Sequence, residues 1–176
     1  LHNSLPDEIR NPIVIKVVET KTQNLIEKCK ELTAYEPQYR IPWIIFDRDR
    51  VPNFDRIISD AERSGINAGW SNPCFEIWIF GSIPSIADSW TCCSKFSELY
   101  EKKTGREYIK SDPDMYARLQ KNGNEENALK YAKLNYDRNV ESGVRTPSKM
   151  SPCTTVHKLV GEIRNKASHE IQANEY

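Results

Sequence analysis

The sequence carries no excess of either charge and contains no long apolar run. Its 25 Lys and Arg balance its 25 Asp and Glu over 176 residues, so the formal net charge is zero. A neutral chain lacks the bulk positive charge that draws proteins to nucleic acid indiscriminately, although a local basic patch remains open. No stretch of about 18 consecutive apolar residues occurs, so we expect no membrane-spanning helix and no membrane partner.

The spacing of the five cysteines fits no zinc motif. The number of cysteines is odd and two of them are adjacent, so we expect reduced thiols in a cytoplasmic protein. The N-terminal residues lack the basic and apolar stretches of a secretory signal peptide, which agrees with that location. The cysteines are Cys29, Cys74, Cys92, Cys93 and Cys153.

Short apolar segments alternate with helical patterns in the first half of the chain. Residues 13–18 are β-branched and predict a strand, residues 43–46 form a continuous apolar run, and residues 66–71 give a weaker strand pattern. A continuous run predicts a strand covered on both faces, as in a parallel sheet. Helical spacing of apolar residues predicts helices near residues 22–32, 54–61 and 74–80. The alternation predicts an α/β core over residues 1–84, with a Toprim- or Rossmann-like, mostly parallel sheet flanked by helices.

The second half of the chain, residues 85–176, predicts a C-terminal helical layer packed on this core. A loop rich in Gly and Pro at residues 141–152 precedes a closing helix at residues 155–166. Further helices are predicted at residues 90–101, 113–120 and 125–140. We find no internal repeat, so this half is expected to extend the core rather than fold independently.

Two acidic residues follow the apolar run at residues 43–46. Ligands gather beyond the carboxyl ends of strands in open α/β sheets, which is where Asp47 and Asp49 are expected. Residues two apart at a strand end point the same way, so both carboxylates can face one Mg²⁺ or Mn²⁺ ion. The structural alternative is that an Asp here only caps the next helix. Arg48 and Arg50 can bind phosphate, or they can form solvated ion pairs.

Two further candidates surround an Asn-Pro turn. Glu76 follows this turn near the start of a helix, where the helix dipole alone would favour an acid. The functional alternative is that Glu76 assists metal binding or catalysis directly. Asn72 can cap the same helix while its side chain faces the site and contacts substrate.

A second polar group is predicted at the start of the closing helix. Thr154 or Thr155 can cap that helix, or Thr155, His157 and Lys158 can together bind a phosphate. Lys158 near the metal could also stabilise charge that develops on a transferring phosphoryl group. The structural alternative is a capped helix with a solvated Lys and a hydrogen-bonded His.

Four segments in order resemble the RloB-like family of Toprim-related proteins. They are FDRD at residues 46–49, PNFD at 52–55, SNPCFEIW at 71–78 and PCTTVHKLV at 152–160. The resemblance runs from about residue 13 to residue 163. The Asp-Arg-Asp motif alone is weak, whereas the ordered set is specific.

The resemblance implies a Toprim-like fold and a role in bacterial or archaeal genome defence, often beside an ATPase partner. It implies a metal-dependent, nuclease-like effector of a phage-defence, abortive-infection or restriction-linked system that hydrolyses DNA or RNA phosphodiesters. In Toprim sites an Asp-x-Asp pair binds Mg²⁺ and a Glu acts as general acid/base, and the pair matches Asp47 and Asp49 here.

The resemblance leaves two alternatives and one gap. The first alternative is a non-catalytic regulatory or sensor subunit that docks an ATPase, with self-association left open. A phosphohydrolase of the haloacid dehalogenase type is disfavoured because its later motifs are absent. The gap is the Toprim Glu: with its strand it would lie upstream of Leu1, and Glu19 is the alternative within the chain.

Overall fold

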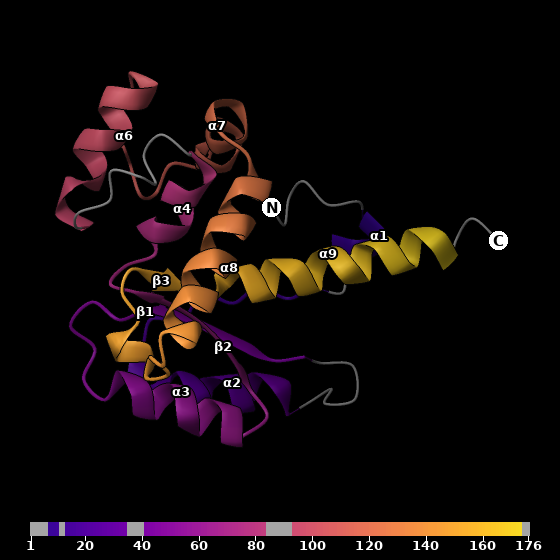
Figure 1. Ribbon diagram of the computed structural model, residues 1–176. Coiled ribbons are helices and arrows are strands. Elements are labelled where there is room, and N and C mark those ends of the chain that lie inside the picture. The colour runs from indigo at the N-terminus through magenta and orange to yellow at the C-terminus, as the bar shows by residue number, and fades with distance from the viewer. Residues whose placement is uncertain (1–6, 11–12, 35–40, 84–92, 174–176) are drawn as a thin grey trace.

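A short mixed sheet carries the residues predicted to form the site. The computed structural model describes residues 7–10, 13–34, 41–83 and 93–173, without the side chains of residues 8–9 and 167–173 (Figure 1). Strand β1 (Trp43–Asp47) pairs in parallel with β2 (Asn67–Asn72), and β2 pairs antiparallel with β3 (Cys153–Thr154), in the order β1-β2-β3. The register sets Asp47 opposite Ser71, so β1 ends beside the last residues of β2.

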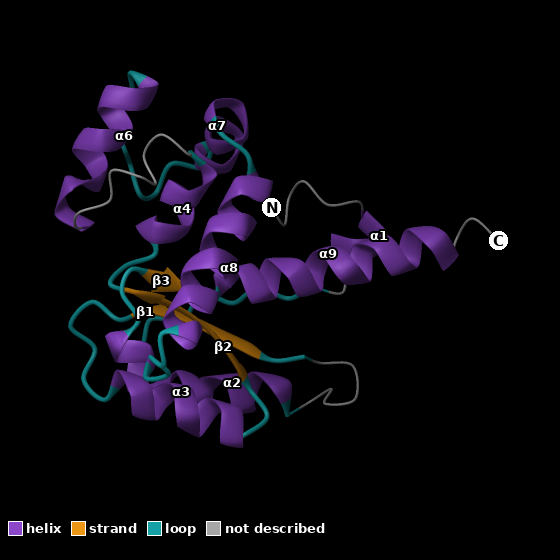
Figure 2. Cartoon of the chain, viewed as in Figure 1, coloured by secondary structure: helices purple, strands orange, loops and turns teal. Residues whose placement is uncertain are grey.

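Helices α2 (Leu25–Thr33) and α3 (Phe54–Arg63) cover one face of this sheet (Figure 2). The apolar face of α3 packs its Phe54 ring edge-on against Phe46 of β1 and Trp70 of β2, with centroids 5.5 and 5.8 Å apart. A helix with apolar residues on one stripe is stabilised by burying that stripe, and α3 follows this pattern.

The opposite side of the sheet is built from helices that come mostly from the second half of the chain. Figure 1 shows α4 beside the upper end of α8, while α9 extends away from the sheet. The helices are α1 (Asp7–Arg10), α4 (Glu76–Ser82), α6 (Phe96–Thr104), α7 (Met115–Asn122), α8 (Glu125–Glu141) and α9 (Val156–Ala173). A second apolar cluster joins α4 to α6 through Phe80, Phe96 and Tyr100.

The predicted strand at residues 13–18 is wrong. These residues have no regular structure, and the side chains of Val14, Ile15 and Val17 are exposed. A β-branched segment becomes a strand only when it pairs and packs, and no described segment pairs with this one. The sheet is therefore smaller than predicted.

The sheet also differs from the prediction in direction and in burial. It is mixed rather than mostly parallel, because β3 pairs antiparallel with β2, and the two residues of β3 show no strand pattern in the sequence. Ile44 and Phe46 are buried but Ile45 is 50% exposed, so β1 is not covered on both faces as its apolar run predicted. The α/β class with flanking helices is confirmed.

The helix predictions are confirmed in type, with shifted ends. The closing helix α9 begins one residue late and continues past residue 166, and α6 begins at Phe96 rather than near residue 90. Residues 90–92 lie outside the described part of the chain. Among the described residues, no helix is both long and apolar enough to cross a membrane.

Candidate functional site

The Asp-Arg-Asp segment forms a tight turn that is fixed to the end of β2. The backbone N–H of Arg48 donates to the carbonyl of Ser71 at 2.8 Å, and that of Asp49 donates to the carbonyl of Pro73 at 2.9 Å. Asp49 has a φ of 33°, in the left-handed region that Asp tolerates better than most residues. Strand alternation therefore ends at Asp47 and no longer sets the direction of the Asp49 side chain.

Asp47 lies at the centre of a group of acids. Burial raises the pKa of Asp47, and the Glu76 and Asp49 carboxylates raise it further. A hydrogen bond from the backbone of Phe75 and the charge of Lys110 act in the opposite direction on this pKa. Asp47 thus lies within electrostatic reach of both Asp49 and Glu76. That Asp47 and Asp49 face one cation stays a prediction.

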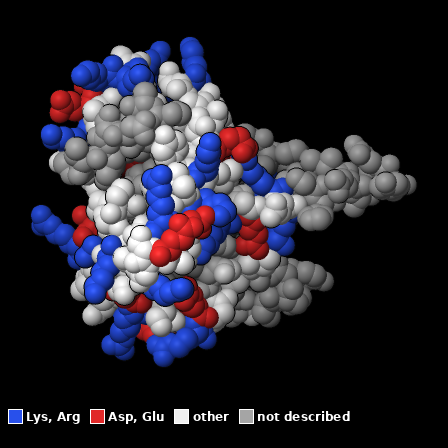
Figure 3. Space-filling view, in the orientation of Figure 1, with Lys and Arg blue, Asp and Glu red and all other residues white. Residues whose placement is uncertain are grey.

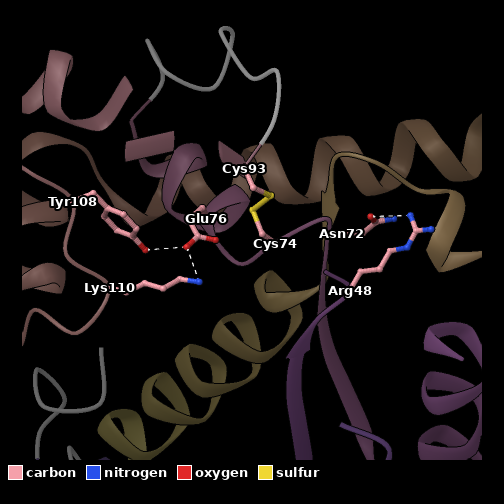
Figure 4. The surroundings of a disulfide bond; sticks show 7 residues. All are labelled: Arg48, Asn72, Cys74, Glu76, Cys93, Tyr108 and Lys110. Atoms are coloured by element: carbon pink, nitrogen blue, oxygen red, sulfur yellow. Dashed lines mark hydrogen bonds and ion pairs between the residues drawn. A yellow bond between two sulfur atoms is a disulfide. The ribbon is translucent and has the colours of Figure 1, made fainter. Parts of the chain in front are cut away.

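Glu76 faces this group from the first residue of α4. Its side chain is 7% exposed, and its Oε1 lies 3.0 Å from Lys110 Nζ. The Tyr108 hydroxyl donates to the same oxygen at 3.3 Å (Figure 4). Burial raises the pKa of Tyr108, and so does the charge of Glu76. A hydrogen bond to Glu76 raises the pKa of Lys110, so this cation is retained beside the acids.

Removing the Lys110 charge is expected to raise the pKa of Asp47. Lys110→Met deletes the cation that now lowers this pKa and leaves the repulsion from Glu76 and Asp49 uncompensated. NMR titration of the carboxyl carbons measures the shift. Lys133→Met is the control, because Lys133 is exposed and pairs with Asp137 on α8. An unchanged or lower pKa of Asp47 in Lys110→Met would remove Lys110 from the site.

Arg48 lies on the other side of the turn. In Figure 4 it extends beside Asn72, away from Glu76, Tyr108 and Lys110. Its Nη1 donates to the carbonyl of Ser148 at 2.7 Å and to Asn72 Oδ1 at 3.3 Å. Arg48 follows the last residue of β1, and these two hydrogen bonds hold its side chain beside Asn72 and the 3-10 helix Pro147–Lys149.

Asn72 has a structural position that differs from the prediction. Its side chain is fully buried, and its amide donates to the carbonyls of Met150 at 2.7 Å and Pro147 at 3.0 Å. It does not cap α4, which has no side-chain cap. The 3-10 helix Pro147–Lys149 lies close to β2, and the Asn72 amide donates to its backbone. Arg50, by contrast, is exposed on the turn.

The polar group at the start of α9 does not join the acids. Thr155 is buried, and its Oγ1 accepts from the backbone of Trp70 at 2.9 Å, so its side chain does not cap α9 as predicted. Nδ1 of His157 lies 3.0 Å from the carbonyl of Thr154, which is the hydrogen-bonded alternative given above. Lys158 Nζ lies 4.2 Å over the Tyr136 ring of α8. After β3 pairs antiparallel with β2, the chain enters α9 with Lys158 in contact with α8.

Glu19, the alternative position for the Toprim Glu, is exposed in the irregular segment after residue 13. The charged residues that shift the pKa of Asp47 are Glu76, Lys110 and Asp49, and Glu19 is not among them.

Sequence reasoning also missed Tyr108 and Lys110. They lie in a polar connection between α6 and α7, where no periodic pattern marks a side chain as functional. Only the fold brings this connection to α4.

The donor chemistry fits part of a metal site. Carboxylate oxygens are the ligands that Mg²⁺ and Mn²⁺ prefer, and a cation between Asp47 and Asp49 would relieve their mutual repulsion. Among the described residues, no three His, Cys, Asp or Glu side chains form a complete ligand group. Protein-bound Mg²⁺ often keeps several waters and takes one or two carboxylates plus substrate phosphate oxygens. Two carboxylates therefore suffice for that kind of site.

The prediction of reduced thiols is wrong for two cysteines. Cys74 and Cys93 form a disulfide that ties the start of the α4 segment to the segment leading into α6, with Cα atoms 6.4 Å apart (Figure 4). The fold brings together two residues that the spacing of cysteines did not connect. Cys29 and Cys153 are free, and burial raises the pKa of Cys153 to about 12, so its thiol stays protonated. Cys92 lies outside the described residues.

A family model for RloB-like proteins matches residues 3–163, which is nearly the whole chain. The chain belongs to the RloB-like family. No curated protein and no solved structure matches it. The matched region of this RloB-like chain includes both sides of the Asp-Arg-Asp turn and extends into α9, so every candidate residue described above lies within the family match.

Proposed function

We propose that this RloB-like chain is a metal-dependent nuclease-like effector that hydrolyses nucleic-acid phosphodiesters. The observation that carries the proposal is the pair Asp47 and Asp49 at the carboxyl end of β1. Each acts on its neighbours electrostatically, yet neither forms an ion pair with a described residue. Neighbouring carboxylates that have no ion-pair partner among the described residues are suited to bind a divalent ion.

Asp47 and Asp49 would hold Mg²⁺ or Mn²⁺ in this proposal. When bound, such an ion would polarise a phosphoryl oxygen and lower the pKa of a bound water, which makes that water a better nucleophile. Glu76 holds the Lys110 ammonium near both acids, and the backbone of Phe75 and the charge of Lys110 both lower the pKa of Asp47. The Lys110 side chain is 67% exposed, so its charge is available to a phosphate that approaches the turn.

The biological setting of the proposal follows from the family resemblance. We place the chain in the cytoplasm, in a phage-defence or restriction-linked system with an ATPase partner, acting on DNA or RNA. Lys158 and His157 are not used in this mechanism, because their contacts lie with Tyr136 and Thr154. Their predicted contact with substrate stays a prediction.

One observation favours a second candidate function. The described residues contain no complete group of metal ligands, and Glu76 is already paired with Lys110. A regulatory or sensor subunit that docks an ATPase through this domain would need no complete metal site. The two candidates differ in one measurable property, which is cleavage of nucleic acid by the chain alone.

The test is a cleavage assay on the chain, made with any residues that precede Leu1 in its gene. Plasmid, single-stranded DNA and RNA are each incubated with Mg²⁺, with Mn²⁺ or with EDTA. We expect cleavage of at least one substrate with metal and none with EDTA. Absence of cleavage in every metal arm, with retained binding to a co-encoded ATPase, would refute the nuclease and support the regulatory subunit.

A further inference from the structure

A cavity lies on the side of the turn opposite the acids. It has a volume of about 390 Å³ and is formed by the end of β1, the start of α3 and the loop that carries Ser148. The charged side chains on its wall are Arg48, Arg56 and Asp55. It is therefore a polar cavity within a few residues of Asp47 and Asp49, yet separate from them.

Arg48 brings an uncompensated positive charge to this cavity. Its two hydrogen bonds both start from Nη1 and both end on neutral oxygens, those of Ser148 and Asn72. Within the described residues, Arg48 forms no ion pair, and its Nε and Nη2 have no hydrogen-bond partner. A half-buried guanidinium without a counter-ion is costly, and an anion in the cavity would offset that cost.

The other charges on the wall leave room for an anion. Both carboxylate oxygens of Asp55 are occupied by Ser148, whose backbone N–H and hydroxyl donate at 2.7 and 2.6 Å. Arg56 is exposed at the cavity, and its Nε lies 3.4 Å from Asp60 on the next turn of α3. Two guanidinium groups and one carboxylate thus line this space, which leaves a net positive charge on its wall.

We infer that this cavity binds a phosphate group of a nucleic-acid strand, one that is not the phosphate at the acids. The inference rests on the proposed function and adds a second contact for the same strand. Asp47 is electrostatically coupled to Glu76 and Lys110, whereas Arg48 extends away from those two residues (Figure 4), so a strand that crosses the end of β1 meets both sides of the turn. Arginine binds phosphate through two parallel N–H groups, and Arg48 has such donors free while Nη1 fixes its position.

The distribution of charge on the surface agrees with contacts to individual phosphates rather than attraction by the overall charge. Figure 3 shows Lys and Arg spread over the visible face with Asp and Glu among them. With a net charge of zero, the chain has no broad electrostatic attraction for a polyanion. Binding of a strand then depends on individual phosphate contacts, which single substitutions can remove.

The test measures binding in EDTA and low salt, so that it does not depend on metal or cleavage. Anisotropy of a labelled single-stranded 12-mer DNA gives the affinity of wild type and variants. We expect Arg48→Gln to weaken binding by roughly tenfold and Arg56→Gln by roughly threefold, since each loses charge-assisted contacts to phosphate. Arg63→Gln is the matched control, because Arg63 is exposed on α3 and also pairs with Asp60 but does not line the cavity.

Each outcome of this test decides the inference. Equal affinity of Arg48→Gln and wild type, no binding by wild type, or equal losses in Arg56→Gln and Arg63→Gln would overturn it. If Arg48→Gln fails to fold by circular dichroism, the comparison of Arg56→Gln with Arg63→Gln decides alone. Displacement of the 12-mer by inorganic phosphate, and not by chloride at equal ionic strength, supports a shared phosphate site, whereas phosphate that binds wild type without displacing the 12-mer would assign the cavity to a free anion.

The same variants separate this inference from the proposed function. Arginine-dependent binding without any metal-dependent cleavage would refute the nuclease and leave the phosphate site. Metal-dependent cleavage together with an unchanged affinity of Arg48→Gln and Arg56→Gln for the 12-mer would support the nuclease and refute the phosphate site.

Discussion

Asp47→Asn is expected to lower the rate of metal-dependent cleavage by at least about 10³-fold. A metal at a phosphoryl group supplies several kcal/mol of transition-state stabilisation, and about 4 kcal/mol corresponds to this factor. The amide keeps the shape of the side chain and an oxygen that can accept from the Phe75 backbone, so only the charge is lost. Single-turnover cleavage of the best substrate in Mn²⁺ measures the effect.

The fold of Asp47→Asn is expected to be at least as stable as wild type at neutral pH. The pKa of Asp47 is raised in the folded state, so ionisation of this carboxyl favours unfolding as the pH rises. The amide removes that cost, and the melting temperature should stay equal or rise. Asp137→Asn is the control, because Asp137 is an exposed acid paired with Lys133. Cleavage by Asp47→Asn at the wild-type rate would contradict the proposed role of Asp47.

Gly123→Ala is expected to destabilise the fold by about 3 kcal/mol, which lowers the melting temperature by roughly 10 °C. A Cβ at this position would lie 1.9 Å from the carbonyl oxygen of Ser82, a backbone atom at the end of α4. The backbone cannot easily retreat, because Asn124 N–H donates to that oxygen at 2.9 Å and Gly123 N–H donates to Leu119 at 2.9 Å. Thermal unfolding followed by circular dichroism measures the loss.

Gly161→Ala provides the control for this prediction. Gly161 lies within α9, and a Cβ there meets no atom within 4 Å. Alanine is a better helix former than glycine by up to about 1 kcal/mol, so this variant should be neutral or more stable. Equal melting temperatures for Gly123→Ala and Gly161→Ala would show that the connection of α7 and α8 does not pack on α4 as described.

The elements with strong local patterns could be predicted from the sequence. The apolar run before Asp47 predicted β1, and the spacing of Phe54, Ile57 and Ile58 predicted α3. Their order also placed the two acids at the carboxyl end of a strand. These features depend on residues close together in the chain, where periodicity is informative.

The contacts that define the two sides of the turn could not be predicted. Lys110 reaches Glu76 from a connection without periodicity, and Arg48 is held by Ser148, which lies 100 residues away. The two residues of β3 are too short for a pattern, and residues 13–18 have strand propensity without a pairing partner among the described residues. Each case depends on long-range packing, which overrides local preference.

Binding of Mn²⁺ tests the central claim most directly. The electron paramagnetic resonance signal of free Mn²⁺ is followed during titration of the chain, with the single-stranded 12-mer present to supply phosphate oxygens. We expect wild type to remove the ion from solution, and the double variant Asp47→Asn/Asp49→Asn to bind it at least about tenfold more weakly, because loss of a ligand costs more than loss of a supporting contact. Equal binding by the two proteins, or none by wild type, would contradict a cation site at the end of β1.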